Sequence, residues 1–376
     1  MKRNYLSNLA PAALILFIIL NFSAAGTTVF AQLLFDEAVK LQKCREYEFA
    51  DTAIIAAASD NSNFYVATED GSIHAIDPVT SRKLWTSNMG GRLSSNLIVA
   101  GGRIFLAGNA IPVNGERPQT SILRSLHPKT GLVIWNEPIP YSEQIYLGSS
   151  GKAIISLGRE GSVASKDGAN GNLLWQTSFA GNLTAVPDID FERIIAGTDQ
   201  KEIISIDSKT GSTIMRSKTA FIPSSVLNYT EKAIAAGDER GNLILLESAT
   251  GKSIWKYKSG GKISYIAHTS EGVLAASNDN FIYMLWDYNG DVLWKRRLPG
   301  RVAGPPLIGG DTVTVQLRAD KSAFILNLEN GKIVNQLLLS ENSSAGIMPG
   351  IFNNNLFVFP TPVSVVSYSV KPCSVQ

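Results

Sequence analysis

The side chains with the potential for catalysis or metal binding are few and widely separated. The chain has three histidines, His74, His127 and His268, and no two of them have the spacing of a metal-binding pair. There is no Gly-x-Ser-x-Gly nucleophile elbow and no glycine-rich phosphate loop. We therefore interpret the histidines as structural or surface residues, and we predict no catalytic residue, no metal and no cofactor.

Acidic residues in glycine- and asparagine-rich stretches raise the question of a calcium site. They lie far apart in the sequence and lack the alternating ligand spacing of a calcium-binding loop. We interpret them as solvated turn residues: Glu69, Asp70, Glu160, Asp238, Glu239 and Asp279.

A repeat of about forty residues organises the chain around these side chains. One clear copy is Asp167-Gly-Ala-Asn-Gly-Asn-Leu-Leu-Trp175, and a second begins at Asp207. The copies end at positions 85, 135, 175, 215, 255, 294 and 335, with spacings of 50, 40, 40, 40, 39 and 41. The sixth copy reads as one residue shorter than the others and begins at Asp287.

Each repeat has the pattern of four short strands. Phe64–Thr68 and Ser72–Asp77 are apolar runs joined by Glu-Asp-Gly, which is a hairpin signal. A further strand precedes such pairs, as in Leu93–Val99, and the tryptophan segment supplies the fourth. Repeated four-stranded units predict an all-β fold, a β-propeller of four-stranded antiparallel blades.

The most regular residues of the repeat have structural roles. Glycine in the motif turn permits a positive φ, and the tryptophan is expected to cover the seam between neighbouring blades. Met215 and Asn335 replace this tryptophan, so their seams should pack differently. The structural positions are Trp85, Trp135, Trp175, Trp255, Trp294, Gly131, Gly171, Gly211, Gly251, Gly290 and Gly331.

The two ends of the chain are expected to complete one blade together. Three strands follow the seventh motif without a fourth, and the stretch Glu37–Glu48 precedes the first complete unit without a partner. Placing the N-terminal strand at the outer edge of the last blade gives eight blades and protects the sheet edges. Cys44 and Cys373 would then be neighbours, and we predict a disulfide between them; two free buried thiols are the alternative.

The first 31 residues read as a signal peptide. Lys2 and Arg3 precede the apolar run Leu9–Leu20, and Val29-Phe30-Ala31 fits a cleavage site. Cleavage leaves residues 32–376 as a single propeller domain in the periplasm or outside the cell; an uncleaved N-terminus would instead anchor the protein to the membrane. The mature segment has 32 basic residues (34 minus Lys2 and Arg3) and 32 acidic ones, which does not favour nucleic-acid binding.

The combination of Asp, Thr-Gly and Leu-Trp in each motif resembles the pyrroloquinoline-quinone (PQQ) repeat propellers, over nearly all of residues 37–376. In size, blade number and N-terminal closing strand the chain is similar to the non-enzymatic branch, which contains the outer-membrane protein assembly factor BamB. The dehydrogenase branch has an adjacent Cys-Cys pair beside its cofactor, and this chain has no such pair. The cysteine of a lipid-attachment site is also missing, which sets it apart from typical BamB proteins.

Two departures from the repeat are candidate binding features. The first is an insertion at Asn109–Gln119, which includes Pro112 and Arg117; a neutral loop extension is the alternative. The second is a basic residue where the chain enters the innermost strand, at Arg92, Lys262 and Arg301, with Asn182 at a fourth such position. By topology all of these lie on one face of the ring, although solvated loop charges would give the same pattern.

These features favour a non-enzymatic envelope scaffold that binds a protein partner through the loop face, with outer-membrane protein assembly as the leading example from the resemblance. The alternatives are a PQQ-dependent oxidoreductase and a polysaccharide-binding propeller. No small-molecule ligand or nucleic-acid partner is expected.

Overall fold

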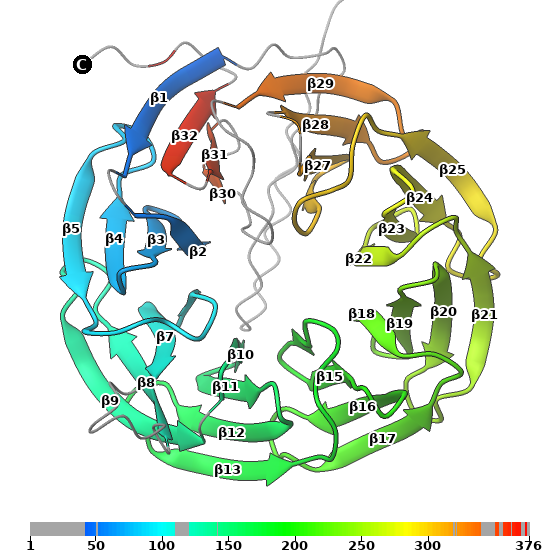
Figure 1. Cartoon of the computed structure of the whole chain (residues 1–376), viewed down its shortest axis with the longest axis horizontal. Helices are drawn as coiled ribbons and strands as arrows, with labels where there is room; N and C mark the ends of the chain where they lie inside the picture. Colours follow the sequence, from blue (N-terminus) through cyan, green and yellow to red (C-terminus); the bar gives the residue numbers. More distant parts are fainter. Residues whose placement is uncertain are drawn as a thin grey trace, which may run out of the picture.

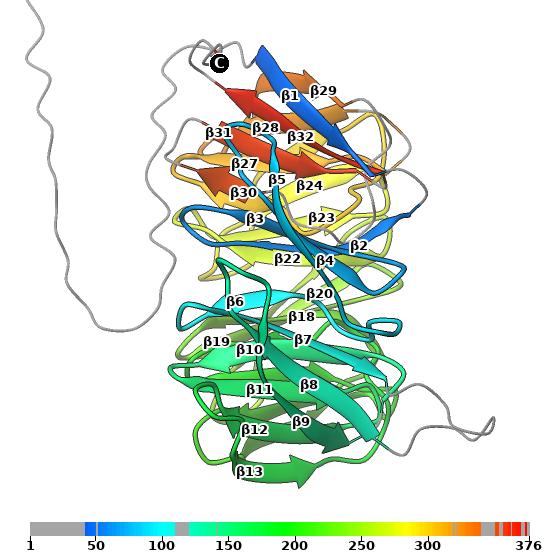
Figure 2. The same ribbon diagram turned by 90° about the vertical axis from the view of Figure 1, so that its left-hand side faces the viewer.

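The computed structural model describes residues 42–49, 52–109, 120–140, 142–318, 320, 322–339, 350–352, 356–361, 363–369 and 373. Within these residues the strands form eight four-stranded sheets, arranged around a central axis (Figures 1 and 2). Neighbouring strands within each of these sheets are antiparallel, as in the pairs β3–β4 and β4–β5. The predicted all-β propeller with four-stranded antiparallel blades is confirmed.

Seven of the sheets are each built from four consecutive strands, and we number them blades 1 to 7. Blade 1 contains β2 (Ile54–Ser59), β3 (Phe64–Thr68), β4 (Ser72–Ile76) and β5 (Lys83–Asn88); blade 2 contains β6 (Ile98–Ala100), β7 (Arg103–Asn109), β8 (Thr120–Leu126) and β9 (Val133–Pro140). Blade 3 contains β10 (Ile145–Ser150), β11 (Ala153–Gly158), β12 (Ser162–Asp167) and β13 (Leu173–Ser178); blade 4 contains β14 (Asp188–Ile189), β15 (Arg193–Gly197), β16 (Glu202–Asp207) and β17 (Thr213–Lys218); blade 5 contains β18 (Pro223–Thr230), β19 (Ala233–Asp238), β20 (Asn242–Glu247) and β21 (Ser253–Lys258). Blade 6 contains β22 (Ile263–His268), β23 (Val273–Ser277), β24 (Phe281–Leu285) and β25 (Val292–Arg297); blade 7 contains β26 (Leu307–Gly309), β27 (Thr312–Gln316), β28 (Ser322–Asn327) and β29 (Ile333–Leu338).

The remaining sheet, which we call the closing blade, joins the two ends of the chain. Its order is β1 (Gln42–Glu48), β32 (Ser364–Ser369), β31 (Leu356–Pro360) and β30 (Gly350–Phe352). β1 pairs with β32 from Gln42 opposite Ser369 to Glu48 opposite Ser364, with one register shift between Lys43 and Arg45. The N-terminal strand therefore closes the last blade, as predicted.

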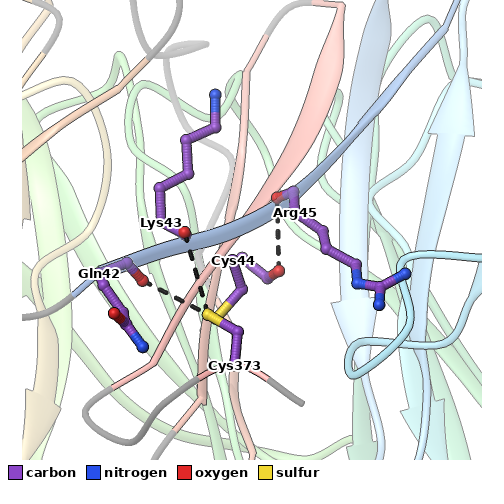
Figure 3. The surroundings of a disulfide bond; sticks show 6 residues. Gln42, Lys43, Cys44, Arg45 and Cys373 are labelled. Carbon is purple, nitrogen blue, oxygen red and sulfur yellow. Dashed lines mark hydrogen bonds between the residues drawn. A yellow bond between two sulfur atoms is a disulfide. The ribbon is translucent and has the colours of Figure 1, made fainter. Parts of the chain in front are cut away.

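A disulfide fixes this closure. Cys44 on β1 is bonded to Cys373, just beyond β32, with a Cα–Cα distance of 5.5 Å and a sequence separation of 329 (Figure 3). The predicted Cys44–Cys373 bond is confirmed. Since the bond spans almost all of the folded ring, it removes much of the conformational freedom of the unfolded chain.

The hydrophobic core lies between blades more than within them. One cluster joins Leu274 and Ile282 of blade 6 to Val313 and Phe324 of blade 7. Another joins Tyr65 and Ile73 of blade 1 to Ile104 and Leu106 of blade 2. Each sheet thus buries both of its faces against its neighbours, which explains the nearly continuous apolar runs in the middle strands.

The motif tryptophans close the seams between blades. The ring of Trp175 lies against Gly211 in the motif turn of the next blade, and a Cβ on that glycine would be 2.5 Å from Trp175 Cε3. The same contact joins Trp85 to Gly131, Trp135 to Gly171, Trp255 to Gly290 and Trp294 to Gly331. All five tryptophans therefore contact the motif turn of the next blade.

Where methionine replaces tryptophan, the seam packs differently, as expected. A Cβ on Gly251 would be 2.5 Å from Ser217 Cβ and 3.2 Å from Met215 Sδ. The Ser217 hydroxyl also donates a hydrogen bond to the Gly251 carbonyl at 3.1 Å.

Two sequence expectations were wrong in detail. The strand predicted at Leu93–Val99 is regular only over Ile98–Ala100, with an isolated bridge from Leu93 to Gly108. The sixth motif is not one residue shorter, because its first residue is Trp286. The Trp286 amide bonds the Asp291 carbonyl, as the Asp207 amide bonds the Ser212 carbonyl in the fourth motif.

Candidate functional site

The ring has two faces that differ in the loops they carry. The face we call the entry face carries the connections between blades and the turns between the second and third strands. The opposite face, which we call the motif face, carries the turns between the first and second strands and the motif turns between the third and fourth. This assignment follows from the antiparallel order of the strands within each blade.

The predicted entry residues occupy equivalent backbone positions on the entry face. The carbonyl of Lys262 accepts a hydrogen bond from the Asn278 amide at 2.8 Å, and the Arg301 carbonyl accepts one from Arg318 at the same distance. The Asn182 carbonyl accepts one from the Asp199 amide at 3.0 Å. Because each bond ties a blade entry to the adjacent turn, the backbone at these positions is well defined.

The charges at these positions are unequal. The Lys262 ammonium forms an ion pair with Glu239, and the Asn182 side-chain amide donates to Asp199 at 2.9 Å. Arg92 and Arg301 are exposed and make no ion pair within the part of the chain that the structure describes. The entry face is therefore a mixed surface with two exposed guanidinium groups, and not a continuous ring of cations.

The inserted segment cannot be placed with them. Asn109 ends β7, while Pro112 and Arg117 lie outside the described residues. The turn that the insertion extends joins β7 to β8, which are neighbours in blade 2, so its attachment points are on the entry face.

Two of the acidic turn residues accept hydrogen bonds from backbone amides. The Asp238 carboxylate accepts from the amides of Arg240 at 2.9 Å and Asn242 at 2.7 Å. Asp279 accepts from the Gly260 amide and from the Tyr283 hydroxyl, at 2.8 and 2.7 Å. Asp238 and Asp279 are thus structural residues, and not only solvated turn residues as predicted.

The same bonding explains a pKa shift at Asp70. A hydrogen bond from the Thr68 hydroxyl at 2.6 Å, assisted by bonds from Ser72, holds the pKa of the Asp70 carboxyl below its usual value. Hydrogen bonds to a carboxylate stabilise its charged form. Among the described residues no cluster of three or more His, Cys, Asp or Glu side chains could hold a metal ion.

The three histidines lie apart, in different blades. His74 is buried in blade 1, where its ring nitrogens contact Thr86 Oγ1 at 2.9 Å and Thr68 Oγ1 at 3.2 Å, and burial lowers its pKa. His127 accepts a hydrogen bond from the Lys129 amide in its motif turn. His268 packs edge-on against Tyr229, with ring centroids 4.9 Å apart. Each has a structural contact, in agreement with the sequence interpretation.

The sequence did not mark one half-buried carboxyl group. Asp188 lies on the inner strand β14, and its pKa is raised to about 6, mainly because burial disfavours the charged form. The Asn228 amide donates to its carboxylate at 2.7 Å and partly offsets that cost. Nothing in its local sequence distinguishes it from an ordinary turn aspartate.

Two exposed aromatic residues were also missed. Trp286 and Tyr288 lie in the motif turn of blade 6, 49% and 78% exposed, with ring centroids 5.9 Å apart. A comparison of the motifs residue by residue would have found Trp286, since it stands where the other motifs have Asp, Asn, Glu or His.

The described part of the chain contains no helix that could cross a membrane.

Known proteins share both the sequence pattern and the fold. A family model described as outer membrane protein assembly factor BamB matches residues 23–116, 119–264 and 239–351. A curated BamB from Nitrosomonas eutropha is 40% identical over 55 residues, which is 15% of this chain and only 13% of that relative's length.

Solved structures show the fold alone, since their identities are low. The crystal structure of BamB from Moraxella catarrhalis has a TM-score of 0.65 and 16% identity, covering 88% of this chain and 100% of that one. Quinohemoprotein alcohol dehydrogenase from Comamonas testosteroni has a TM-score of 0.67 and 11% identity, covering 92% of this chain and 79% of that one. The backbones of these two structures are therefore about equally similar to that of this chain. The family model, which matches most of the chain, shows that this protein belongs to the BamB family of PQQ-repeat β-propellers.

Proposed function

We propose that this protein is a non-enzymatic scaffold of the cell envelope that binds a protein partner through its entry face, in the assembly of outer-membrane proteins. The family match carries the proposal, and the function named by that family supplies the process. We further propose that residues 1–31 are a signal peptide and that residues 32–376 form one exported domain in the periplasm.

The entry face has the chemistry of a partner-binding surface. Arg92 and Arg301 are exposed and free of ion pairs within the described residues, and arginine is enriched at the centres of protein interfaces. The Arg301 carbonyl accepts a hydrogen bond from the Arg318 amide, so little backbone freedom is lost at this position when its guanidinium group binds. Lys262 is a weaker candidate because a partner must displace Glu239. Asn109, Pro112 and Arg117 remain candidates.

Charge reversal tests this surface. The double variant Arg92→Glu and Arg301→Glu should recover markedly less partner from a cross-linked envelope extract than the wild type. Lys129→Glu is the matched control, because Lys129 is an exposed cation on the motif face. Equal recovery by all three proteins would refute the assignment of the entry face, and a variant lacking residues 110–119 tests the insertion in the same way.

Quinoprotein activity is tested separately. Titration of the purified protein with PQQ and calcium, followed by dye reduction with alcohols or sugars, should give no saturable binding and no turnover. Turnover with tight PQQ binding would replace the scaffold proposal with the oxidoreductase alternative. Binding to a glycan array, with no effect of the arginine variants on protein recovery, would favour the polysaccharide alternative.

A further inference from the structure

Trp286 takes the place of a turn-forming residue without changing the turn. In the fourth motif the Gly211 amide bonds the Asp207 carbonyl, and in the sixth motif the Gly290 amide bonds the Trp286 carbonyl, both at 2.8 Å. The motif turn of blade 6 therefore has the backbone of the others. Only the side chain at its first position differs.

The replacement removes hydrogen bonds that other motif turns have. The Asp207 carboxylate accepts from the amides of Lys209 and Thr210, each at 2.8 Å. An indole ring has no acceptor for these two amides. Trp286 is half exposed and belongs to neither of the hydrophobic clusters that join blade 6 to blades 5 and 7. Tyr288, two residues further, is more exposed still. The fold gives no reason for either ring.

The surroundings of these rings are acidic. Asp287 and Asp291 belong to the same turn and are exposed. Glu271 lies in the adjacent turn. A Cβ added to the next residue, Gly272, would be 3.6 Å from Trp286 Cα. None of the three carboxylates forms an ion pair with another described residue. We call Glu271, Trp286, Asp287, Tyr288 and Asp291 the aromatic patch.

The same face shows what such a ring binds when a cation is within reach. In blade 4 the exposed ring of Phe191 has the Lys209 ammonium 4.3 Å from its centroid. No such contact is recorded for Trp286 or Tyr288 among the described residues, where the other cation–π pair is Lys295 over Phe281. The electron-rich faces of tryptophan and tyrosine attract cations, and nearby carboxylates strengthen the attraction.

We propose that the aromatic patch is a second binding site, which takes a lysine or arginine side chain from an extended, basic segment of a protein partner. The site lies on the motif face, opposite the entry face, so it goes beyond the function proposed above and is independent of Arg92 and Arg301. The two rings and the carboxylates of these two adjacent turns attract one cation. The carboxylates can also accept hydrogen bonds from the peptide amides next to it.

A synthetic octapeptide of alternating arginine and serine tests the site, with its glutamate–serine counterpart as the charge control. Titration of the whole protein should quench tryptophan fluorescence with the arginine peptide and leave it unchanged with the glutamate peptide. Trp286→Asn restores the residue type found in the seventh motif, at Asn327, and should weaken binding by about threefold to thirtyfold when followed with labelled peptide. Because Asn can accept the free turn amides, this variant should unfold at the same temperature as the wild type or higher.

Phe191→Ala is the matched control, since it removes an exposed aromatic ring from the same face. It should leave peptide affinity unchanged, as should the double arginine variant of the entry face. Absence of binding to the wild type, or equal affinity of wild type and Trp286→Asn, would overturn the proposal. Binding of neutral oligosaccharides at the patch, in preference to the peptide, would also overturn it and assign the rings to sugar stacking.

Discussion

The contact between tryptophan and glycine at each seam allows a direct test of how the ring is held together. Gly211 has a φ of +74°, and a Cβ added to it would be 2.5 Å from Trp175 Cε3. Gly90 has a φ of +72°, but a Cβ added to it would have no atom within 4 Å. Alanine at either position adopts a left-handed conformation at a cost of about 1–2 kcal/mol. Only Gly211→Ala must also displace an indole ring in a packed seam, which adds about 1–3 kcal/mol.

The free energy of unfolding should therefore fall by about 1–2 kcal/mol in Gly90→Ala and by about 2–5 kcal/mol in Gly211→Ala. Urea denaturation followed by tryptophan fluorescence measures both values, provided that unfolding is reversible. A second pair of proteins isolates the contact: in a Trp175→Ala background, Gly211→Ala should cost no more than Gly90→Ala. Equal losses for the two glycines in the wild-type background would refute the seam argument and leave the positive φ as the only reason for glycine.

Three further predictions concern other parts of the ring. Cys44→Ser removes a bond with a sequence separation of 329 and should lower the free energy of unfolding by about 6 kcal/mol in the loop-entropy model. An unchanged urea midpoint under oxidising conditions would show that β1 is held by its backbone pairing alone. The pKa of Asp188 is about 6 in the folded protein and 3.8 in the unfolded reference, so the native state binds the proton more tightly. The protonated carboxyl therefore contributes stability that is fully present below pH 3.8 and is lost as the pH rises through 6. Asp188→Asn should consequently be more stable than the wild type by on the order of 2–3 kcal/mol above pH 6, and melting curves that differ equally at pH 4 and pH 8 would contradict this. Asp238→Ala removes the oxygen that accepts hydrogen bonds from two turn amides and should cost about 1–3 kcal/mol. Glu239→Ala is the control, since Glu239 is exposed and contributes only a surface ion pair.

The fold was predictable because the repeat places the same residue types at the same structural positions. A glycine that must have a positive φ and a tryptophan that must cover a seam recur at fixed spacing, and the structure uses them as the pattern implies, from Trp85–Gly131 onward. The Cys44–Cys373 bond followed from the topology, because closure of a ring brings its first and last strands together.

The candidate sites were less predictable, because they depend on side-chain contacts between turns. The ion pair of Lys262 with Glu239 joins two loops 23 residues apart, and no local pattern marks it. The acidic turn residues bond their own backbone, which a count of charges does not reveal. The pattern Asp287-Tyr-Asn-Gly290 resembles the start of a motif and hides Trp286, although the Trp286 carbonyl and amide make the two bonds that define the first motif position.

The composite closing blade also has a consequence for the order in which this chain can acquire its structure. Blades 1 to 7 are each complete once about forty consecutive residues are available, whereas β1 finds its partner only when Ser364–Ser369 has been delivered. Until then the first segment of the folded ring has an unpaired backbone, which is a template for association with other chains. A protein that crosses a membrane from its N-terminus would hold this edge open through nearly the whole of translocation. Formation of the Cys44–Cys373 bond is therefore a natural reporter of the last step of maturation, and trapping of free thiols during export would time it.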